Sequence, residues 1–204
     1  MTRINNTRDY HRHGRIDLMT EFTISESLRS TDSLYSKALK MSSSYGAMVG
    51  RKLAGMDLLK PGCRVCEVGG GYGSLMGGLL DTYAAGIRRV TMIDLSRHLL
   101  ERQRARLKPW GSKVAFVQGD ISELIHSLRG VDLMILNEVI GDLDTWMDLS
   151  AREFPGDIAR FIRDYNLDIP EKGKFHINIG ALRLLEEICR KGIPSFICEH
   201  SSDP

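Results

Sequence analysis

The alternation of strand-like and helix-like segments after residue 60 is the feature that most constrains the fold of this chain. Short apolar runs typical of buried strands occupy residues 64–70, 89–96, 114–120, 131–139 and 194–200. Helix-like segments lie between them at 74–86, 97–108 and 179–192. Strands separated by helices pair in parallel through right-handed crossovers, and helices then cover both faces of the sheet. The sequence therefore predicts an α/β fold with a Rossmann-like, doubly wound, mainly parallel sheet, for which the order 3-2-1-4-5 is simplest.

Three regions fall outside this alternation. Residues 1–60 begin with a polar stretch that predicts a loosely docked lead-in, and one or two helices should follow it. The Rossmann-like domain then spans 61–204, with an insertion at about 142–178 that is longer than an ordinary loop. We expect this insertion to be a cap over the site or, alternatively, a packing subdomain. The sequence ends just after the fifth strand, so we expect a sheet shortened at its C-terminus, whose open edge would favour a homo-oligomer.

Composition limits the classes of partner and the compartment. The formal net charge of +2 is too balanced to indicate nucleic-acid binding, and the absence of an eighteen-residue apolar run argues against a membrane protein. The four cysteines predict free thiols in a cytoplasmic protein. Cys63 and Cys66 form a C-x-x-C pair, but residues three apart in a strand face opposite sides, so both should be buried. No second group of ligands accompanies them, and we expect no metal site.

A glycine-rich loop, E-V-G-G-G-Y-G at 67–73, occupies the first strand-to-helix turn. Glycines let the backbone turn tightly and approach a ligand, and the following helix offers N–H groups at its start. Such a loop alone can be purely structural. The residues expected to contact a ligand here are Glu67, Gly69, Gly70, Gly71 and Gly73.

Polar side chains also follow the next three strands. Asp94 ends the second strand, where a carboxylate can accept hydrogen bonds from ribose hydroxyls, and Asp120 ends the third, where it can accept from an adenine amine. Each aspartate alone could be a helix N-cap. Their recurrence at consecutive strand ends favours one shared site. Further expected contacts in this site are Leu95, Ile121 and Asn137.

The details of the loop favour a cationic cofactor over a dinucleotide. The dinucleotide pattern G-x-G-x-x-G/A needs glycine or alanine at its third position, which Ser74 occupies here. Glu67 precedes the first glycine by two residues, and a carboxylate suits a sulfonium and an ammonium better than a pyrophosphate.

The E-V-G-G-G-Y-G loop resembles that of the class I S-adenosylmethionine (SAM)-dependent methyltransferase superfamily. By this resemblance Gly69, Gly71 and Gly73 would contact the methionine part of SAM, Asp94 the ribose and Asp120 the adenine. GGGYGSLMGGLL, LNEVIGDL and HINIGALRLLEEICRKGIPSFICEH resemble segments of the MidA-type family, which includes complex I assembly methyltransferases that act on protein arginine. The chain departs from that family at Gly70, where a proline is usual, and after the fourth and fifth strands.

The resemblance implies transfer of a methyl group, a reaction that needs alignment more than a nucleophilic side chain. Glu138 and Asp142 are the expected catalytic residues, because carboxylates near the methyl group would orient an amine or a guanidinium. The acceptor stays open between protein arginine, another nitrogen and a small molecule. Two alternatives remain: a non-catalytic SAM-binding or assembly module, and an NAD-dependent oxidoreductase.

Overall fold

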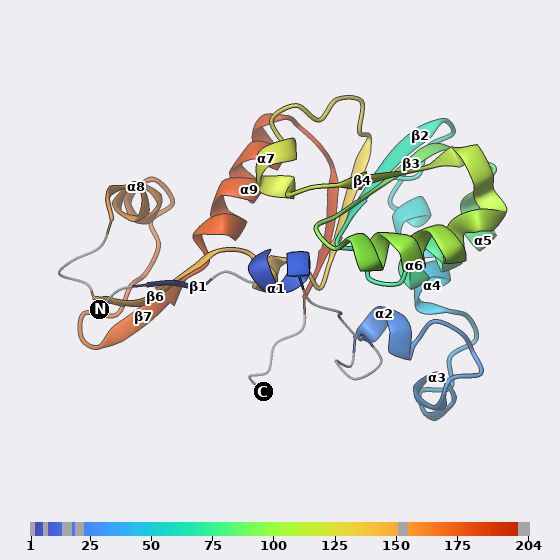
Figure 1. Ribbon diagram of the computed structural model, residues 1–204, viewed down its shortest axis with the longest axis horizontal. Helices are drawn as coiled ribbons and strands as arrows, with labels where there is room; N and C mark the ends of the chain where they lie inside the picture. Colours follow the sequence, from blue (N-terminus) through green and yellow to red (C-terminus); the bar gives the residue numbers. More distant parts are fainter. Residues whose placement is uncertain (1–2, 6–7, 14–17, 19–22, 151–154, 200–204) are drawn as a thin grey trace.

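The computed structural model describes residues 3–5, 8–13, 18, 23–150 and 155–199. Its central sheet has five strands in the order β4-β3-β2-β5-β8, and every neighbouring pair is parallel (Figure 1). Numbered along this sheet alone, that order is 3-2-1-4-5. The predicted α/β class and strand order are both confirmed. The strands are β2 (Cys63–Val68), β3 (Ile87–Asp94), β4 (Val114–Gln118), β5 (Leu133–Asn137) and β8 (Ser195–Cys198).

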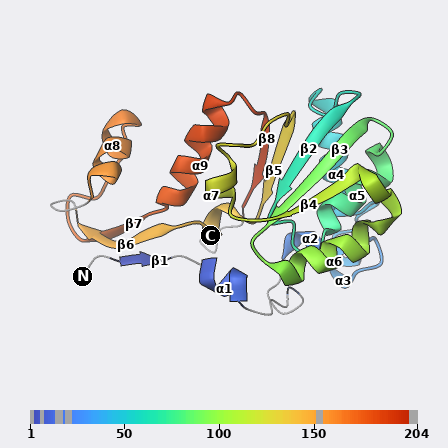
Figure 2. The same cartoon turned by 45° about the horizontal axis from the view of Figure 1, so that its top comes forward.

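Helices cover both faces of the central sheet, as Figure 2 shows. One face carries α4 (Tyr45–Gly55), α5 (Ser74–Tyr83) and α6 (Arg97–Leu107), and the other carries α7 (Ile121–Leu124) and α9 (Ile179–Arg190). A 3₁₀ helix, η1 (Lys108–Lys113), follows α6. Serine, aspartate or asparagine side chains cap α4, α6, α7 and α9 at their N-termini, which satisfies backbone N–H groups that a helix leaves unpaired.

The alternation of side chains along β2 separates the two layers of the core. Cys63 and Val65 pack in the cluster under α4 and α5, whereas Cys66 and Val68 pack in the cluster under α7 and α9. The two cysteines are buried free thiols on opposite faces of the sheet. The predicted burial of the C-x-x-C pair is therefore confirmed.

A second sheet, which the sequence did not predict, extends away from the central one (Figures 1 and 2). It has three antiparallel strands in the order β1-β6-β7, namely β1 (Arg3–Asn5), β6 (Thr145–Ser150) and β7 (Lys174–Ile177). With α8 (Gly156–Asp164) it encloses a small core of its own, formed by Leu149, Ile158, Phe161 and Ile179. The insertion thus packs as a subdomain against the start of α9.

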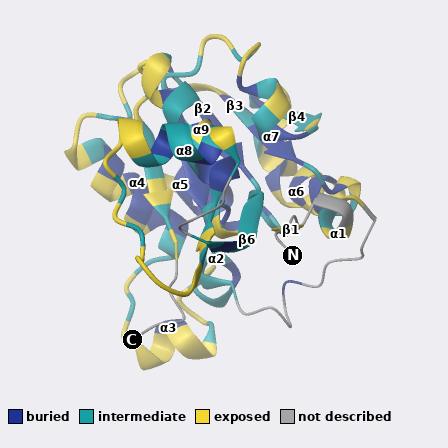
Figure 3. Ribbon diagram, turned by 90° about the vertical axis from the view of Figure 1, so that its left-hand side faces the viewer, coloured by how far each residue is buried: buried dark blue, intermediate teal, exposed yellow. Residues whose placement is uncertain are grey.

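The N-terminal region contains three short helices, α1 (Arg8–His13), α2 (Ile24–Ser27) and α3 (Leu34–Ala38). Figure 3 shows α3 almost wholly exposed, while buried residues gather at the central sheet. We expected the first thirty or so residues to be a loosely docked lead-in. Its described part contains the helices α1 and α2, and residues 14–17 and 19–22 are not among the residues that the structure describes. Within the described residues, no helix has both the length and the apolar character needed to cross a membrane.

Candidate functional site

The carboxyl ends of the central strands surround a cavity of about 430 Å³. Parallel pairing sets Val68 beside Ile93 and Leu136, so that β2, β3 and β5 end at the same edge of the sheet. Ligand sites in doubly wound folds lie at this edge, where the winding reverses. The predicted residues that line the cavity are Gly69, Gly71, Asp94, Leu95, Asp120, Ile121, Asn137, Glu138 and Asp142.

The glycine loop forms the floor of the cavity. Gly69 and Gly71 have φ angles of +60° and +55°, a left-handed conformation that disfavours residues with a side chain. A Cβ atom at Gly69 would lie 2.5 Å from Val139 Cγ2, and one at Gly71 would lie 2.8 Å from Leu18 Cδ1. The loop backbone therefore lies too close to Val139 and to Leu18 for a side chain to fit between them.

Glu67 lies behind this loop and does not line the cavity. It is 1% exposed, and a Cβ atom on Gly70 would come within 3.3 Å of its Oε2. Among the described residues, Oε2 has no hydrogen-bond partner. Burial and the negative charge of Asp94 raise the pKa of Glu67 to about 8. The loop thus rests on a carboxyl group that is mostly neutral at pH 7. Gly70 and Gly73 also lie outside the cavity lining.

Asp94 is 5% exposed at the end of β3 and is held by two donors. Its Oδ1 accepts a hydrogen bond from the Ser96 N–H at 2.9 Å, and its Oδ2 accepts one from Gln103 Nε2 at 2.8 Å. Gln103 Nε2 also donates to the Gly71 carbonyl at 3.1 Å, so Asp94 and the glycine loop share one support. Burial raises the pKa of Asp94 to about 6, against the opposing effect of the two hydrogen bonds.

The ends of β4 and β5 supply the next polar groups. Asp120 caps α7, and its Oδ1 accepts from the Ser122 N–H at 2.8 Å. Asn137 Oδ1 accepts from the Tyr45 hydroxyl at 2.9 Å, while its Nδ2 donates to Glu138 Oε2 at 3.1 Å. Asn137 therefore connects α4 to the carboxylate that we expected to be catalytic.

Glu138 and Asp142 also line the cavity. Glu138 has a φ of +56°, which is unusual for a residue with a side chain and turns the chain sharply after β5. Each of its carboxylate oxygens lies 3.0 Å from the Ile24 N–H. Asp142 ends η2 (Ile140–Asp142), where its carboxylate is 3.4 Å from His11 Nε2. Both carboxylates thus contact the N-terminal region.

One wall of the cavity comes from residues that the sequence analysis missed. His11, Leu18, Thr23 and Ser25 line it from the N-terminal side. The Leu18 N–H donates to the Tyr72 hydroxyl at 3.1 Å, which joins this wall to the glycine loop. A signal was present in the sequence, because T-I-S-E at 23–26 has the spacing of a capping box and marks a helix start.

Glu26 anchors that wall. Its side chain is 4% exposed, accepts a hydrogen bond from the Ser74 hydroxyl at the start of α5, and lies 3.7 Å from Arg106 Nη2 on α6. Glu26→Gln should therefore lower the free energy of unfolding by about 1 to 3 kcal/mol, the contribution of hydrogen bonds to a charged group. It should also weaken S-adenosylhomocysteine binding several-fold, because Thr23 and Ser25 would lose their support.

Glu101→Gln is the matched control, because Glu101 pairs with Arg97 on the exposed surface of α6. Exposed pairs of this kind contribute between zero and about 1 kcal/mol. Urea unfolding and titration calorimetry with S-adenosylhomocysteine would measure both effects. Equal values for the two variants would contradict the anchoring role of Glu26.

The charge of the cavity is one-sided. Six carboxylates line it, from Asp94, Asp120, Glu138, Asp142, Asp144 and Glu199. Among the described lining residues there is no lysine or arginine. A field of this sign favours cationic ligands and opposes phosphates. The described residues contain no group of three or more ligands that could hold a metal ion.

The donor set fits SAM. SAM carries a sulfonium and an ammonium and has no phosphate. These charges suit a cavity that is lined by carboxylates and has no lysine or arginine among its described lining residues. Its ribose hydroxyls can donate to Asp94 and its adenine amine to Asp120, while the glycine loop leaves room for the methionine part. Glu67 Oε2, which has no hydrogen-bond partner within the described part of the chain, lies directly behind that loop.

Comparison with known proteins points to the same chemistry. A family model described as a methyltransferase domain matches residues 65–153. This match covers somewhat less than half of the chain and runs from within β2 to just after β6. No curated protein sequence shows significant similarity to the chain.

Solved structures show a partial likeness. A putative sarcosine dimethylglycine methyltransferase from Galdieria sulphuraria has 13% identity and a TM-score of 0.41, over 47% of this chain and 36% of that chain. A putative RNA methyltransferase from Pyrococcus horikoshii has 22% identity and a TM-score of 0.39, over 45% and 43%. A SAM-dependent methyltransferase from Thiobacillus denitrificans, solved with S-adenosylhomocysteine, has 24% identity and a TM-score of 0.37, over 45% and 35%.

Each overlap covers less than half of either chain. The segment matched by the family model includes the glycine loop and the polar ends of β3, β4 and β5. Residues 65–153 of the chain are therefore similar to a methyltransferase domain.

Proposed function

We propose that this protein transfers a methyl group from SAM to a nitrogen acceptor, an amine or a guanidine, on a protein or a small molecule. The observation that carries the proposal is the acidic cavity at the carboxyl ends of the strands, which has no lysine or arginine among its described lining residues. Bound SAM supplies the methyl group: a lone pair of the acceptor bonds to the methyl carbon while the C–S bond breaks and its electron pair stays on sulfur.

The residues of the chain contribute binding, orientation and exclusion of water. Asp94 and Asp120 would hold the ribose and the adenine, and the glycine loop would contact the methionine part. Glu138 and Asp142 would orient a cationic or hydrogen-bonding acceptor and stabilise the positive charge that arrives on it. The resemblance to the MidA-type family favours a protein arginine as the acceptor. We also propose that the protein acts in the cytoplasm.

The charge of the cavity also separates this function from the oxidoreductase alternative. A dinucleotide brings two phosphates, and six lining carboxylates, with no lysine or arginine among the described lining residues, would repel them. The non-catalytic module differs from the enzyme in turnover, not in cofactor binding, so an activity measurement distinguishes them.

Transfer of tritium from methyl-labelled SAM is the direct test. The acceptors would be a cell lysate, an arginine-containing peptide and a set of small amines, with calorimetry for SAM, S-adenosylhomocysteine and NAD in parallel. The proposal expects binding of SAM and its product together with label in at least one acceptor. Binding without any transfer would favour the non-catalytic module, and binding of NAD alone would favour the oxidoreductase.

Asp94→Ala should weaken S-adenosylhomocysteine binding by more than about tenfold, or roughly 1.4 kcal/mol, because both ribose hydroxyls lose their acceptor. In the unchanged protein, affinity should fall as the pH drops below about 6, where Asp94 takes up a proton. Asp132→Ala is the control, since Asp132 binds Arg64 near the opposite edge of the sheet. Unchanged affinity in Asp94→Ala, measured by calorimetry, would remove the ribose assignment.

A further inference from the structure

A histidine from the N-terminal region pairs with a carboxylate inside the cavity. His11, on α1, lines the cavity, and its Nε2 lies 3.4 Å from Asp142 Oδ2. The histidine side chain is 21% exposed, so its ring contacts both the cavity and solvent. The charge of His11 also acts on Asp94 across the cavity and lowers the pKa of that carboxyl group.

An acidic cavity that attracts an amine creates a chemical difficulty for the proposed function. Carboxylates stabilise the protonated amine, and a protonated amine has no lone pair with which to attack a methyl group. Transfer to nitrogen therefore needs a base in the cavity that removes a proton near neutral pH. Imidazole has an ordinary pKa of about 6.5, which suits this task.

The other titratable groups around His11 are less suited to be that base. Glu138 accepts hydrogen bonds from the Ile24 N–H and from Asn137, which makes it an anchor for α2. Asp94 is buried and is held by Ser96 and Gln103. Glu199 accepts a hydrogen bond from the Gly141 N–H at 2.8 Å. Among the described lining residues, His11 is the single histidine, and lysine, tyrosine and cysteine do not occur.

We infer that His11 is the base that takes the proton from the methyl acceptor, and that Asp142 orients its ring; this inference rests on the proposed function. The 3.4 Å contact between Nε2 and Asp142 Oδ2 would fix the orientation of the ring in the cavity. The imidazole of His11 takes one proton from the acceptor, and the N–H electron pair becomes the lone pair of the nitrogen. This lone pair bonds to the methyl carbon while the C–S bond breaks and its electron pair stays on sulfur. Asp142 stabilises the resulting imidazolium, and the exposed part of the ring passes the proton to water.

A binding measurement tests the place of His11 without turnover. The histidine ring would be titrated by NMR in protein loaded with S-adenosylhomocysteine, with and without n-butylammonium or n-butylguanidinium. A cation bound beside the ring should lower the apparent pKa of His11 by about one unit, because the two positive charges repel each other. The same titration with n-butanol should leave it unchanged.

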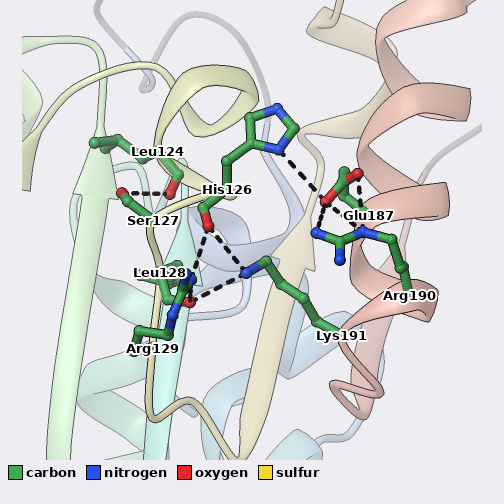
Figure 4. Close-up of polar contacts among 8 residues, drawn as sticks. All are labelled: Leu124, His126, Ser127, Leu128, Arg129, Glu187, Arg190 and Lys191. Carbon is green, nitrogen blue, oxygen red and sulfur yellow. Dashed lines mark hydrogen bonds and ion pairs between the residues drawn. The ribbon is translucent and has the colours of Figure 1, made fainter.

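His126 is the matched control. Its Nδ1 lies 3.4 Å from Glu187 Oε2 on the surface between α7 and α9, where Lys191 contacts the carbonyl oxygens of His126 and Leu128 (Figure 4). This pair has the same separation as that of His11 with Asp142 but does not line the cavity. A His11 titration that shifts no more than that of His126 would overturn the inference.

Kinetics give a second, independent reading. His11→Ala should lower kcat by about 10²-fold, the usual effect of a general base, with S-adenosylhomocysteine affinity retained. Added imidazole should restore part of the rate, and the loss of rate on acidification through the imidazole range should disappear. His126→Ala should retain both the rate and its pH profile. Equal rates and pH profiles for His11→Ala and the unchanged protein would overturn the role of His11. Absence of transfer by the unchanged protein would instead count against the proposed function. In that case the NMR titration would still decide whether His11 lies beside the bound cation.

Discussion

Glu67→Gln should make the protein more stable at pH 9, and the gain should vanish at pH 4. Burial, with a smaller effect of the Asp94 charge, raises the pKa of Glu67 from 4.5 to about 8 in the folded protein. Between pH 4.5 and about pH 8, Glu67 keeps a proton in the folded protein that it has released in the unfolded chain. Stability must then fall as the pH rises through this window, because the folded state binds more protons.

The size of the effect follows from the width of the window. Each pKa unit corresponds to about 1.4 kcal/mol, so a fully ionised Glu67 destabilises the fold by roughly 5 kcal/mol above pH 8. Glutamine has nearly the shape of the neutral acid and does not titrate. The variant should therefore match the unchanged protein at low pH and exceed its stability progressively above pH 5.

Urea unfolding at a series of pH values from 4 to 9 would measure the difference. Glu123→Gln, at an exposed position on α7, is the control for the same substitution outside the core, and it should not reproduce the large gain at pH 9. A pH-independent difference between Glu67→Gln and the unchanged protein would refute the prediction. Bound SAM should lower the pKa of Glu67 in the folded protein, because its positive charges favour the ionised carboxylate. The pH range over which stability falls should then be shorter.

The positions of the strands and of the polar residues at their ends were predictable because both depend on local sequence. Apolar runs fixed β2, β3, β4, β5 and β8, and parallel pairing then brings their carboxyl ends to one edge. For this reason Asp94, Asp120 and Asn137 could be assigned to one site from their places in the chain, and they line one cavity in the structure.

The N-terminal wall could not be predicted in the same way, because it depends on contacts between distant segments. The Ile24 N–H reaches Glu138 across 114 positions, and Ser74 reaches Glu26 across 48. A short polar segment such as 23–27 has no apolar periodicity to reveal which surface it covers. The same reason explains the three-stranded sheet, in which β1 pairs with β6 although more than a hundred residues separate them.

Glu138 shows how such a contact changes the interpretation of a residue. From sequence it is a carboxylate at the end of a strand, ready to orient an acceptor. In the structure its oxygens accept from the Ile24 N–H and from Asn137, so it also holds the wall in place. Substitution of Glu138 should therefore weaken cofactor binding as well as the orientation of the acceptor.

Gly69→Ala should abolish most cofactor binding while leaving the protein folded. Gly69 has a φ of +60°, which costs a residue with a side chain about 1 to 2 kcal/mol. In addition, the new methyl group would lie 2.5 Å from Val139 Cγ2, and Val139 is a β-branched residue that is 8% exposed. Either the loop or Val139 must move, and both line the cavity. We expect S-adenosylhomocysteine affinity to fall by about a hundredfold, or roughly 2.7 kcal/mol.

Gly192→Ala separates the strain from the contact. Gly192 has a φ of +63°, and nothing lies within 4 Å of the position that its Cβ atom would occupy. It follows α9 on the exposed surface, away from the cavity. Both variants should therefore lose similar stability from backbone strain, but affinity should fall in Gly69→Ala alone. Calorimetry with S-adenosylhomocysteine and urea unfolding of the two variants would show this difference. If Gly69→Ala bound as tightly as Gly192→Ala, the glycine loop could not be the floor of the cofactor site.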